Sequence, residues 1–172
     1  MKTAIFPGSF DPFTIGHAAI VGRGLSLFDR IVIGVGKNES KRSLYTAEER
    51  VRAISELYAD NPQVKVVGYD DLTIDLARRE GAQFILRGIR SVKDFEYERD
   101  IANINERLAG IETVLLITDP QHASISSSVV RELIAFGKDV TEFLPQKKRA
   151  ISTDSPQKHP DNSPNPHSTH AL

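Results

Sequence analysis

Short apolar runs rich in β-branched residues alternate along this chain with segments of helical periodicity. The runs, each bounded by turn residues, are residues 3–6, 30–35, 64–67, 84–86 and 113–117. Helical patterns follow them at residues 17–28, 46–58, 71–80, 91–108 and 126–136. Parallel strands need crossover connections, and helical crossovers cover both faces of the sheet. The alternation therefore predicts an α/β fold, a Rossmann-like, doubly wound, five-stranded parallel sheet with helices on both faces.

The helix boundaries carry signals of their own. Thr46 and Glu49 form a capping-box pattern at the start of one helix, and Ser91 offers a cap to another. Gly81 and Gly137 stand where a helix commonly ends in a left-handed residue. These signals support the predicted order of elements.

Length and composition suit one globular domain over residues 1–149 of the 172. The net charge of −1 gives no basic field for nucleic acid or an anionic membrane. The absence of cysteine excludes disulfides, thiolate catalysis and cysteine-based zinc sites. The first residues do not form a signal peptide, and no apolar run approaches the ~20 residues of a spanning helix. We therefore expect a soluble, cytoplasmic protein.

Residues 150–172 differ from the rest of the chain. This tail holds four of the nine prolines and three of the five histidines, but no aromatic residue. It buries too little apolar surface to offset its ordering entropy, so we expect it to be disordered. Its histidines (His159, His167 and His170) lack regular metal-ligand spacing, so we interpret them as solvated.

Ligands of doubly wound sheets bind outside the carboxyl ends of the strands. The first such loop runs from Pro7 to His17 and leads into a helix. Gly8 would let backbone approach a phosphate, Ser9 offers a hydroxyl, and His17 stands at a helix start that favours anions. The loop is neither a dinucleotide fingerprint nor a P-loop. A lone Gly-His pair would favour the simpler interpretation, a strand–helix turn whose Gly and Pro residues only shape the backbone.

The whole string changes that balance. Pro-Gly-Ser-Phe-Asp-Pro-Phe-Thr-Ile-Gly-His, residues 7–17, resembles the [TH]-x-G-H signature of the nucleotidyltransferase superfamily. In this full form it is similar to the bacterial phosphopantetheine adenylyltransferases. Thr14, where many relatives carry histidine, favours that branch over the nicotinate-nucleotide branch.

The resemblance extends over residues 1–146. Further blocks match in the family's order and spacing, at residues 40–42, 45–50, 86–90, 94–98 and 125–131. Lys41, Arg87 and Arg90 offer cationic groups to phosphates, and Ser126, Ser127 and Ser128 offer hydroxyls and helix N-terminal amides. The alternatives are a solvated lysine, arginines paired with Asp94, Glu96 or Glu98, and simple N-capping by Ser126.

The resemblance implies transfer of AMP from ATP to 4′-phosphopantetheine, giving dephospho-coenzyme A and pyrophosphate. It implies catalytic roles for His17, Lys41 and Arg90. Ser9, Lys41, Thr73 and Arg87 would bind the acceptor. The ATP-binding set would be Ser9, Phe10, His17, Gly88, Ile89, Arg90, Glu98, His122, Ala123, Ser124, Ile125, Ser126, Ser127 and Ser128.

Mg²⁺ is expected to accompany the phosphates, held by substrate oxygens, because the sequence contains no dedicated metal site. The family resemblance also suggests a homohexamer. His122 and Ala123 depart from the family pattern, in which an aromatic residue is common, so they leave adenine recognition open.

Three alternatives remain at this stage. The chain could be a related nucleotidyltransferase with another phosphate acceptor, or a module that senses ATP or coenzyme A without turnover. A sensing module need not keep both His17 and Lys41, so their joint presence favours an enzyme. A nucleic-acid-binding domain is disfavoured by the lack of a basic surplus.

Overall fold

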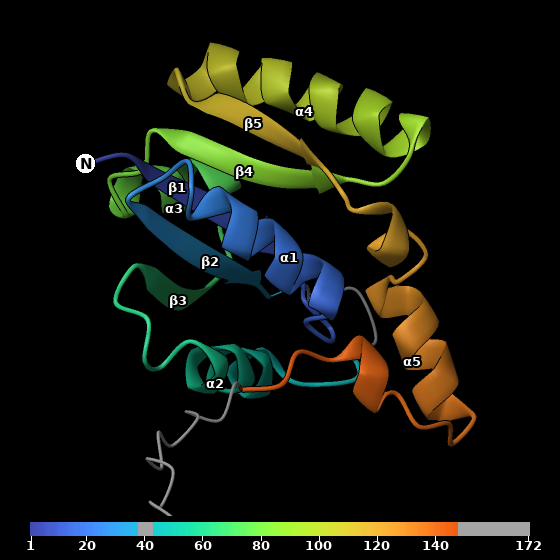
Figure 1. Cartoon of the computed structure of the whole chain (residues 1–172). Coiled ribbons are helices and arrows are strands. Elements are labelled where there is room, and N and C mark those ends of the chain that lie inside the picture. The colour runs from blue at the N-terminus through green and yellow to red at the C-terminus, as the bar shows by residue number, and fades with distance from the viewer. Residues whose placement is uncertain (38–42, 148–172) are drawn as a thin grey trace, which may run out of the picture.

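The computed structural model describes residues 1–37 and 43–147. Its centre is a five-stranded sheet in the order β3-β2-β1-β4-β5, and all neighbouring strands are parallel (Figure 1). The strands are β1 (Thr3–Gly8), β2 (Arg30–Gly36), β3 (Val64–Tyr69), β4 (Phe84–Ile89) and β5 (Glu112–Ile117). The predicted fold class is confirmed, and every predicted strand is present.

Helices cover both faces of this sheet. They are α1 (Ile15–Gly24), α2 (Ala47–Leu57), α3 (Thr73–Arg79), α4 (Val92–Ala109) and α5 (Ser127–Ala135). Within β1, Phe6 points into a core shared with α1 and α2, whereas Ile5 points into a second core shared with α3. This alternation follows from the two-residue period of a strand, and it requires both faces of the strand to be apolar.

The predicted caps form, and one helix is shorter than predicted. The side chain of Thr46 accepts a hydrogen bond from the amide of Glu49, and Gly81 adopts a φ of +63° after α3. The helix predicted at residues 17–28 ends at Gly24. A Cβ at Gly24 would lie 2.7 Å from Leu86 Cδ2, so the missing side chain lets the helix end press onto the sheet. The chain then turns directly into β2, and Phe28 enters the core.

The strand order places a switch point between β1 and β4. From β1 the chain proceeds outward to β2 and β3, and it then crosses back to β4 and β5. The loops that leave β1 and β4 therefore diverge at the carboxyl edge, where open α/β sheets bind their ligands. Helix α5 lies at the same edge and is attached to the first loop, because Ser127 Oγ donates to the carbonyl of Pro12 over 2.8 Å.

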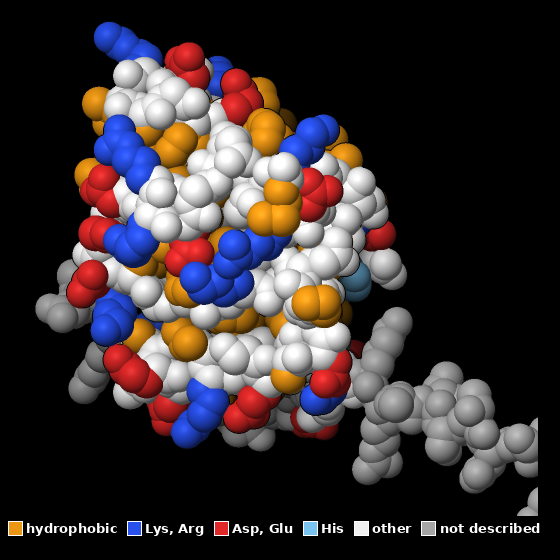
Figure 2. All heavy atoms as spheres, turned by 90° about the vertical axis from the view of Figure 1, so that its left-hand side faces the viewer, with side chains coloured by type: hydrophobic (Ala, Val, Ile, Leu, Met, Phe, Trp, Pro, Cys, Tyr) orange, Lys and Arg blue, Asp and Glu red, His pale blue; other side chains and the backbone are white. Residues whose placement is uncertain are grey.

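The face formed by the amino-terminal ends of the strands carries acidic and basic side chains interspersed with one another (Figure 2). Among residues 1–37 and 43–147, no helix has the length and apolar character needed to cross a membrane.

Substitution of Leu86 tests the assignment of the core between the sheet and helices α1 and α2. Its side chain is fully buried between β4 and α1, so we expect Leu86→Ala to lower the free energy of unfolding by about 2–5 kcal/mol. Leu27 is half exposed, and Leu27→Ala is the matched control, expected to change stability by less than about 0.5 kcal/mol. Urea denaturation measures both. Equal losses in the two variants would contradict the assigned core.

Candidate active site

Two cavities open at the carboxyl edge of the sheet. The larger, of about 600 Å³, lies between the first loop, the end of β4 and the start of α5. The smaller, of about 350 Å³, lies between the ends of β2 and β3 and the side of α4. The residues that line both cavities are Pro7, Gly8, Ser9, Arg87 and Glu98. The switch point therefore holds two adjoining compartments with a common wall.

His17 lines the larger cavity in a defined protonation state. The backbone N–H of Thr14 donates to Nδ1 of His17 over 3.0 Å, so Nδ1 carries no proton and the hydrogen resides on Nε2. The ring packs among Phe6, Phe10 and Phe13. Burial, reinforced by the positive charges of Arg90 and Arg87, lowers the pKa of His17 to about 4. His17 is thus a neutral donor with its Nε2–H available to the larger cavity.

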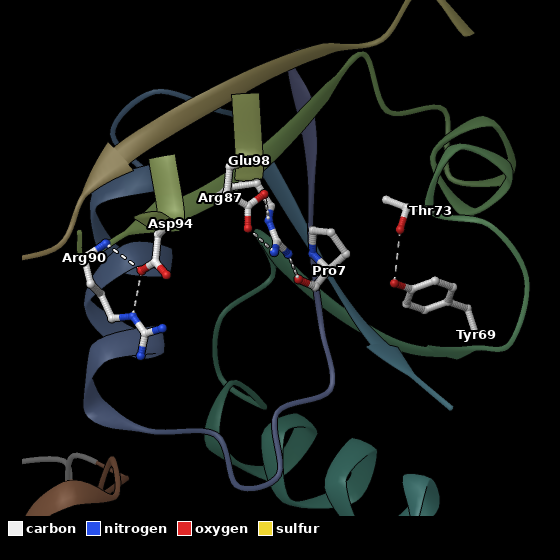
Figure 3. Close-up of polar contacts among 7 residues, drawn as sticks. All are labelled: Pro7, Tyr69, Thr73, Arg87, Arg90, Asp94 and Glu98. Carbon is white, nitrogen blue, oxygen red and sulfur yellow. Dashed lines mark hydrogen bonds and ion pairs between the residues drawn. The ribbon is translucent and has the colours of Figure 1, made fainter. Parts of the chain in front are cut away.

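Arg87 and Glu98 form the wall between the compartments. Arg87 Nε donates to Glu98 Oε2 over 2.8 Å, and its NH1 donates to the carbonyl of Pro7 over 2.6 Å (Figure 3). Glu98 is buried. The sequence assigned Arg87 to an acceptor and Glu98 to ATP, and the structure joins them in one ion pair that borders both cavities.

Arg90 lies on the outer side of the larger cavity. Its Nε donates to Asp94 Oδ2 over 3.0 Å, and its backbone N–H donates to the same oxygen (Figure 3). Burial raises the pKa of Asp94, but the hydrogen bonds and charge of Arg90 outweigh it and lower the pKa below its usual range. The carboxylate pairing considered for these arginines therefore exists. It leaves the other guanidinium nitrogens of Arg90 at the cavity.

The serine turn, residues 126–128 at the start of α5, offers mainly backbone groups to the larger cavity. Ser126 caps the amide of Val129, Ser127 Oγ donates to Pro12, and Ser128 Oγ accepts from Arg131. All three hydroxyls thus have protein partners. The amides of Ser127 and Ser128 belong to the first turn, where no helix carbonyl can accept them, so they can bind an anion.

The segment before α5 closes the larger cavity on another side. His122 and Ile125 line it, and His122 approaches Gly16, where a Cβ would lie 3.8 Å from the carbonyl of His122. Nδ1 of His122 is buried without a partner among the described residues. Three residues predicted to contact ATP do not line the cavity that the described residues form: Ile89, Ala123 and Ser124.

Other predicted residues fall in three groups. Ser9, Phe10 and Gly88 line the larger cavity. Thr73 lines the smaller one, where its Oγ1 lies 3.3 Å from the hydroxyl of Tyr69 (Figure 3). Lys41 lies outside the described residues.

Gly8, which lines both cavities, also makes room within the first loop. A Cβ at Gly8 would lie 2.8 Å from two ring carbons of Phe10, so its missing side chain makes room for that ring. Phe10 itself has a φ of 49°, in the left-handed region. The close approach at Gly8 is therefore between the glycine and a core aromatic ring of the same loop.

The described carboxylates of the larger cavity are already engaged. Asp94 accepts from Arg90 and Glu98 from Arg87, while Asp11 accepts the amides of Leu44 and Tyr45. Among residues 1–37 and 43–147, no group of three acidic or histidine side chains could hold a metal ion. A divalent cation would therefore depend on oxygens that a ligand brings with it.

Comparison with known proteins decides the family. Residues 5–133 match the cytidylyltransferase-like family model. The phosphopantetheine adenylyltransferase of Phocaeicola vulgatus is 61% identical over 146 residues, which cover 85% of this chain and 97% of the relative. That of Flavobacterium psychrophilum is 48% identical over 149 residues, covering 87% and 99%. The chain belongs to the phosphopantetheine adenylyltransferase family.

A solved structure agrees on the fold. A bifunctional NMN adenylyltransferase/ADP ribose pyrophosphatase from Francisella tularensis, complexed with AMP and a manganese ion, superposes with a TM-score of 0.64. It is 12% identical in sequence, and the match covers 83% of this chain and 44% of that chain. The resemblance inferred from the motifs is thus confirmed at the level of the family, and the chain is an enzyme of the nucleotidyltransferase type.

Sequence reasoning did not assign a role to Arg50, which the structure of this adenylyltransferase places between segments of the site. Arg50 is buried, and its guanidinium donates to the carbonyls of Ser9, Gly36 and Tyr45, which belong to three different segments of the site. A signal was present in the sequence. Arg50 stands four residues before Ile54, so a charged residue occupies the apolar side of α2.

The protonation state of His17 yields a first prediction for this site. A histidine in an unfolded chain titrates near ~6.5, whereas burial holds the pKa of His17 near about 4. The unfolded chain therefore binds more protons between these values, and His17 makes stability fall as pH drops from 6.5 towards 4. Nitrogen NMR of the ligand-free protein at pH 6 should show a neutral His17 with its proton on Nε2. Titration of His17 near pH 6.5 would contradict this.

Arg50 yields a second prediction. Lysine keeps the charge but lacks the planar fork that reaches several carbonyls at once. We expect Arg50→Lys to lower the free energy of unfolding by at least about 1.5 kcal/mol, the contribution of one lost hydrogen bond to a charged group. Arg52→Lys, at an exposed position of the same helix, should remain near the parent value. Urea denaturation compares them, and a neutral Arg50→Lys would refute the role of Arg50 as a structural tie.

Proposed function

We propose that this enzyme transfers the adenylyl group of ATP to 4′-phosphopantetheine, giving dephospho-coenzyme A and pyrophosphate. The relatives' names supply the acceptor. The observation that carries the proposal is the common wall of the two cavities, with Ser9 and Arg87 bordering both. Donor and acceptor can occupy separate compartments and still meet at one boundary.

The reaction is a direct displacement at phosphorus. A phosphate oxygen of the acceptor attacks the α-phosphorus of ATP, the bond from that phosphorus to the bridging oxygen breaks, and pyrophosphate leaves with the electron pair. The acceptor is already anionic near neutral pH, since the second pKa of a phosphate monoester is about 6. No protein base is required, so catalysis consists of positioning and of stabilising developing charge.

In the larger cavity, His17 would donate its Nε2–H to an α-phosphate oxygen. A neutral donor suits this role, because it strengthens its hydrogen bond as charge develops without binding the ground-state triphosphate as tightly as a cation would. Arg90 and the amides of Ser127 and Ser128 would hold the β- and γ-phosphates. His122 and the neighbouring residues would bound the adenine, and the unpartnered Nδ1 of His122 offers it a hydrogen-bonding group.

In the smaller cavity, Thr73 and Arg87 would hold the acceptor, with Ser9 at the boundary. Lys41 would bridge the acceptor phosphate and the α-phosphate. Mg²⁺ would enter with the ATP phosphates, since the nearby carboxylates have protein partners. We also propose that the enzyme works in the cytoplasm as a homohexamer, as the family resemblance implies.

The experiment that tests this function is a pyrophosphate-release assay with ATP, Mg²⁺ and 4′-phosphopantetheine. Nicotinate mononucleotide serves as the control acceptor. Release with phosphopantetheine alone is the expected result. Release only with the control acceptor would move the protein to the neighbouring branch of the family. Binding of ATP without release in either case would support a sensing module and refute the proposed activity.

The donor role of His17 can be separated from its structural role. In His17→Asn the side-chain oxygen can still accept the amide of Thr14, but the Nε2–H is lost. We expect kcat to fall about 10²–10³-fold, as for loss of one preorganised donor, while the Kd for ATP stays near the parent value. Single-turnover kinetics and titration calorimetry measure the two quantities.

His17→Gln is the matched control, because its amide N–H reaches towards the position of Nε2. It should retain more activity than His17→Asn. A variant His17→Asn that loses ATP affinity but keeps its kcat would refute the role in the transition state.

A further inference from the structure

Lys37 is a cation at the smaller cavity to which sequence reasoning assigned no role. It directly follows Gly36, the last residue of β2, and it lines the cavity together with Ser9 and Thr73. Its side chain is 42% exposed, and Nζ lies 3.5 Å from Oε1 of Glu48. Glu48 belongs to the first turn of α2 and lines neither of the two cavities at the carboxyl edge. The ammonium group therefore lies between the smaller cavity and the start of α2.

The backbone of Lys37 is held beside the boundary between the two cavities. Its amide donates to the carbonyl of Tyr69, at the end of β3, over 2.8 Å. One guanidinium nitrogen of Arg50 donates to the carbonyl of Gly36 over 3.2 Å and also to the carbonyl of Ser9. Ser9 lines both cavities. Lys37 therefore extends its flexible side chain from a fixed point next to the place where donor and acceptor would meet.

The described lining of the smaller cavity is acidic on balance. Its charged side chains are the carboxylates Asp70, Asp71 and Glu98 and the cations Lys37 and Arg87. Arg87 is paired with the buried Glu98, so its charge is largely compensated within the protein. The carboxylate that pairs with Lys37 lies outside the cavity, and its side chain is 75% exposed. Among the described residues of this lining, Lys37 is thus the cation with the weaker partner.

A phosphorylated ligand needs such a cation. A phosphate monoester carries a charge of about −1.5 to −2 at pH 7, and the carboxylates of the lining repel it. An ammonium group is a compact charge with three donors on a flexible stem, so Lys37 can turn from one anion to another. The exposed pair with Glu48 contributes little stability. Glu48 also stays favourable without Lys37, because it lies at the positive end of the α2 dipole.

We infer that Lys37 is a further acceptor-binding residue, whose ammonium group leaves Glu48 and pairs with the acceptor phosphate when the smaller cavity fills. The inference rests on the proposed function, in which this cavity holds 4′-phosphopantetheine. Lys37 contributes to binding of the acceptor and not of ATP, because it lines only the smaller cavity. Glu48 competes for the same ammonium group, so the two residues have opposite effects on acceptor binding.

The first test compares Lys37→Gln with the parent in steady-state kinetics. We expect KM for 4′-phosphopantetheine to rise about three- to tenfold, as for loss of one partly exposed charge pair, with kcat and KM for ATP near the parent values. Lys37→Arg keeps the charge and should stay close to the parent. Lys2→Gln removes the same charge from an exposed residue before β1, at the opposite edge of the sheet, and should leave both KM values unaltered. An unaltered acceptor KM in Lys37→Gln would overturn the inference.

Glu48→Gln separates acceptor binding from a structural role of the pair. Loss of the competing carboxylate frees Lys37, so we expect KM for the acceptor to fall, by about twofold. A pair that only fixed the start of α2 would raise KM in both variants or change it in neither. In the Lys37→Gln background, Glu48→Gln should lower KM less than it does in the parent. A rise in KM, or equal effects in the two backgrounds, would contradict the exchange, and circular dichroism verifies that each variant folds.

Ionic strength tests whether the effect of Lys37 is one of charge. Salt screens the attraction between a partly exposed ammonium group and a phosphate. The ratio of the acceptor KM of Lys37→Gln to that of the parent should therefore fall towards one as the salt concentration rises. A ratio that does not depend on salt would contradict an ion pair with the acceptor.

Titration calorimetry with 4′-phosphopantetheine distinguishes failure of this inference from failure of the proposed function. If the parent protein released no pyrophosphate, the proposed function would fail, but a weaker Kd for Lys37→Gln than for the parent would still support the role of Lys37. Equal Kd values in the two proteins, or no binding to the parent, would overturn it. Equal Kd values in an active parent would leave the proposed function standing.

Discussion

One guanidinium holds the switch point of the sheet together. Arg87 extends from β4, donates to the carbonyl of Pro7 on β1, and pairs with Glu98 on α4 (Figure 3). Strand β1 is far in sequence from β4 and α4, and β1 and β4 are the neighbouring strands between which the strand order reverses. Because Glu98 is buried, loss of Arg87 would leave an unpaired carboxylate in the protein, which is strongly unfavourable. The pair thus both stabilises the fold and divides the active-site space.

The first loop is fixed by a second set of buried polar contacts. Asp11 accepts the amides of Leu44 and Tyr45, and the guanidinium of Arg50 donates to the carbonyls of Ser9, Gly36 and Tyr45. These contacts hold the loop against the start of α2, while Arg131 of α5 donates to the carbonyl of Asp11. The loop is therefore fixed before any ligand binds, as electrostatic preorganisation requires.

The sequence was sufficient for the fold class, because alternating apolar runs and helices allow few arrangements. It was less informative where single contacts decide the outcome. Helix propensity does not predict that α1 ends at Gly24, because that end packs against Leu86 of β4. It also does not predict that Gly8 makes room for the ring of Phe10 in the same loop. Arg50 has a sequence signal, but its carbonyl partners lie in three segments that only the folded chain brings together.

For the site, the motifs located the residues better than they specified the interactions. His17, Arg90 and the serine turn do line one cavity, and Thr73 and Arg87 line the other. The carboxylate partners of the arginines and the capping bonds of the serines are the simple alternatives that the sequence left open. They coexist with the site, because an arginine has five N–H donors and a helix start has free amides besides its cap.

The central claim is that donor and acceptor meet directly across the wall shared by the two cavities, with no covalent enzyme intermediate. The most direct test uses ATP in which sulfur replaces one α-phosphate oxygen, so that the α-phosphorus is chiral. The measurement is whether the configuration at this phosphorus is inverted or retained in the product. A single in-line displacement inverts the configuration at that phosphorus, and inversion in the dephospho-coenzyme A product is the predicted result. Retention would require two successive displacements through an adenylylated side chain, and it would contradict the account.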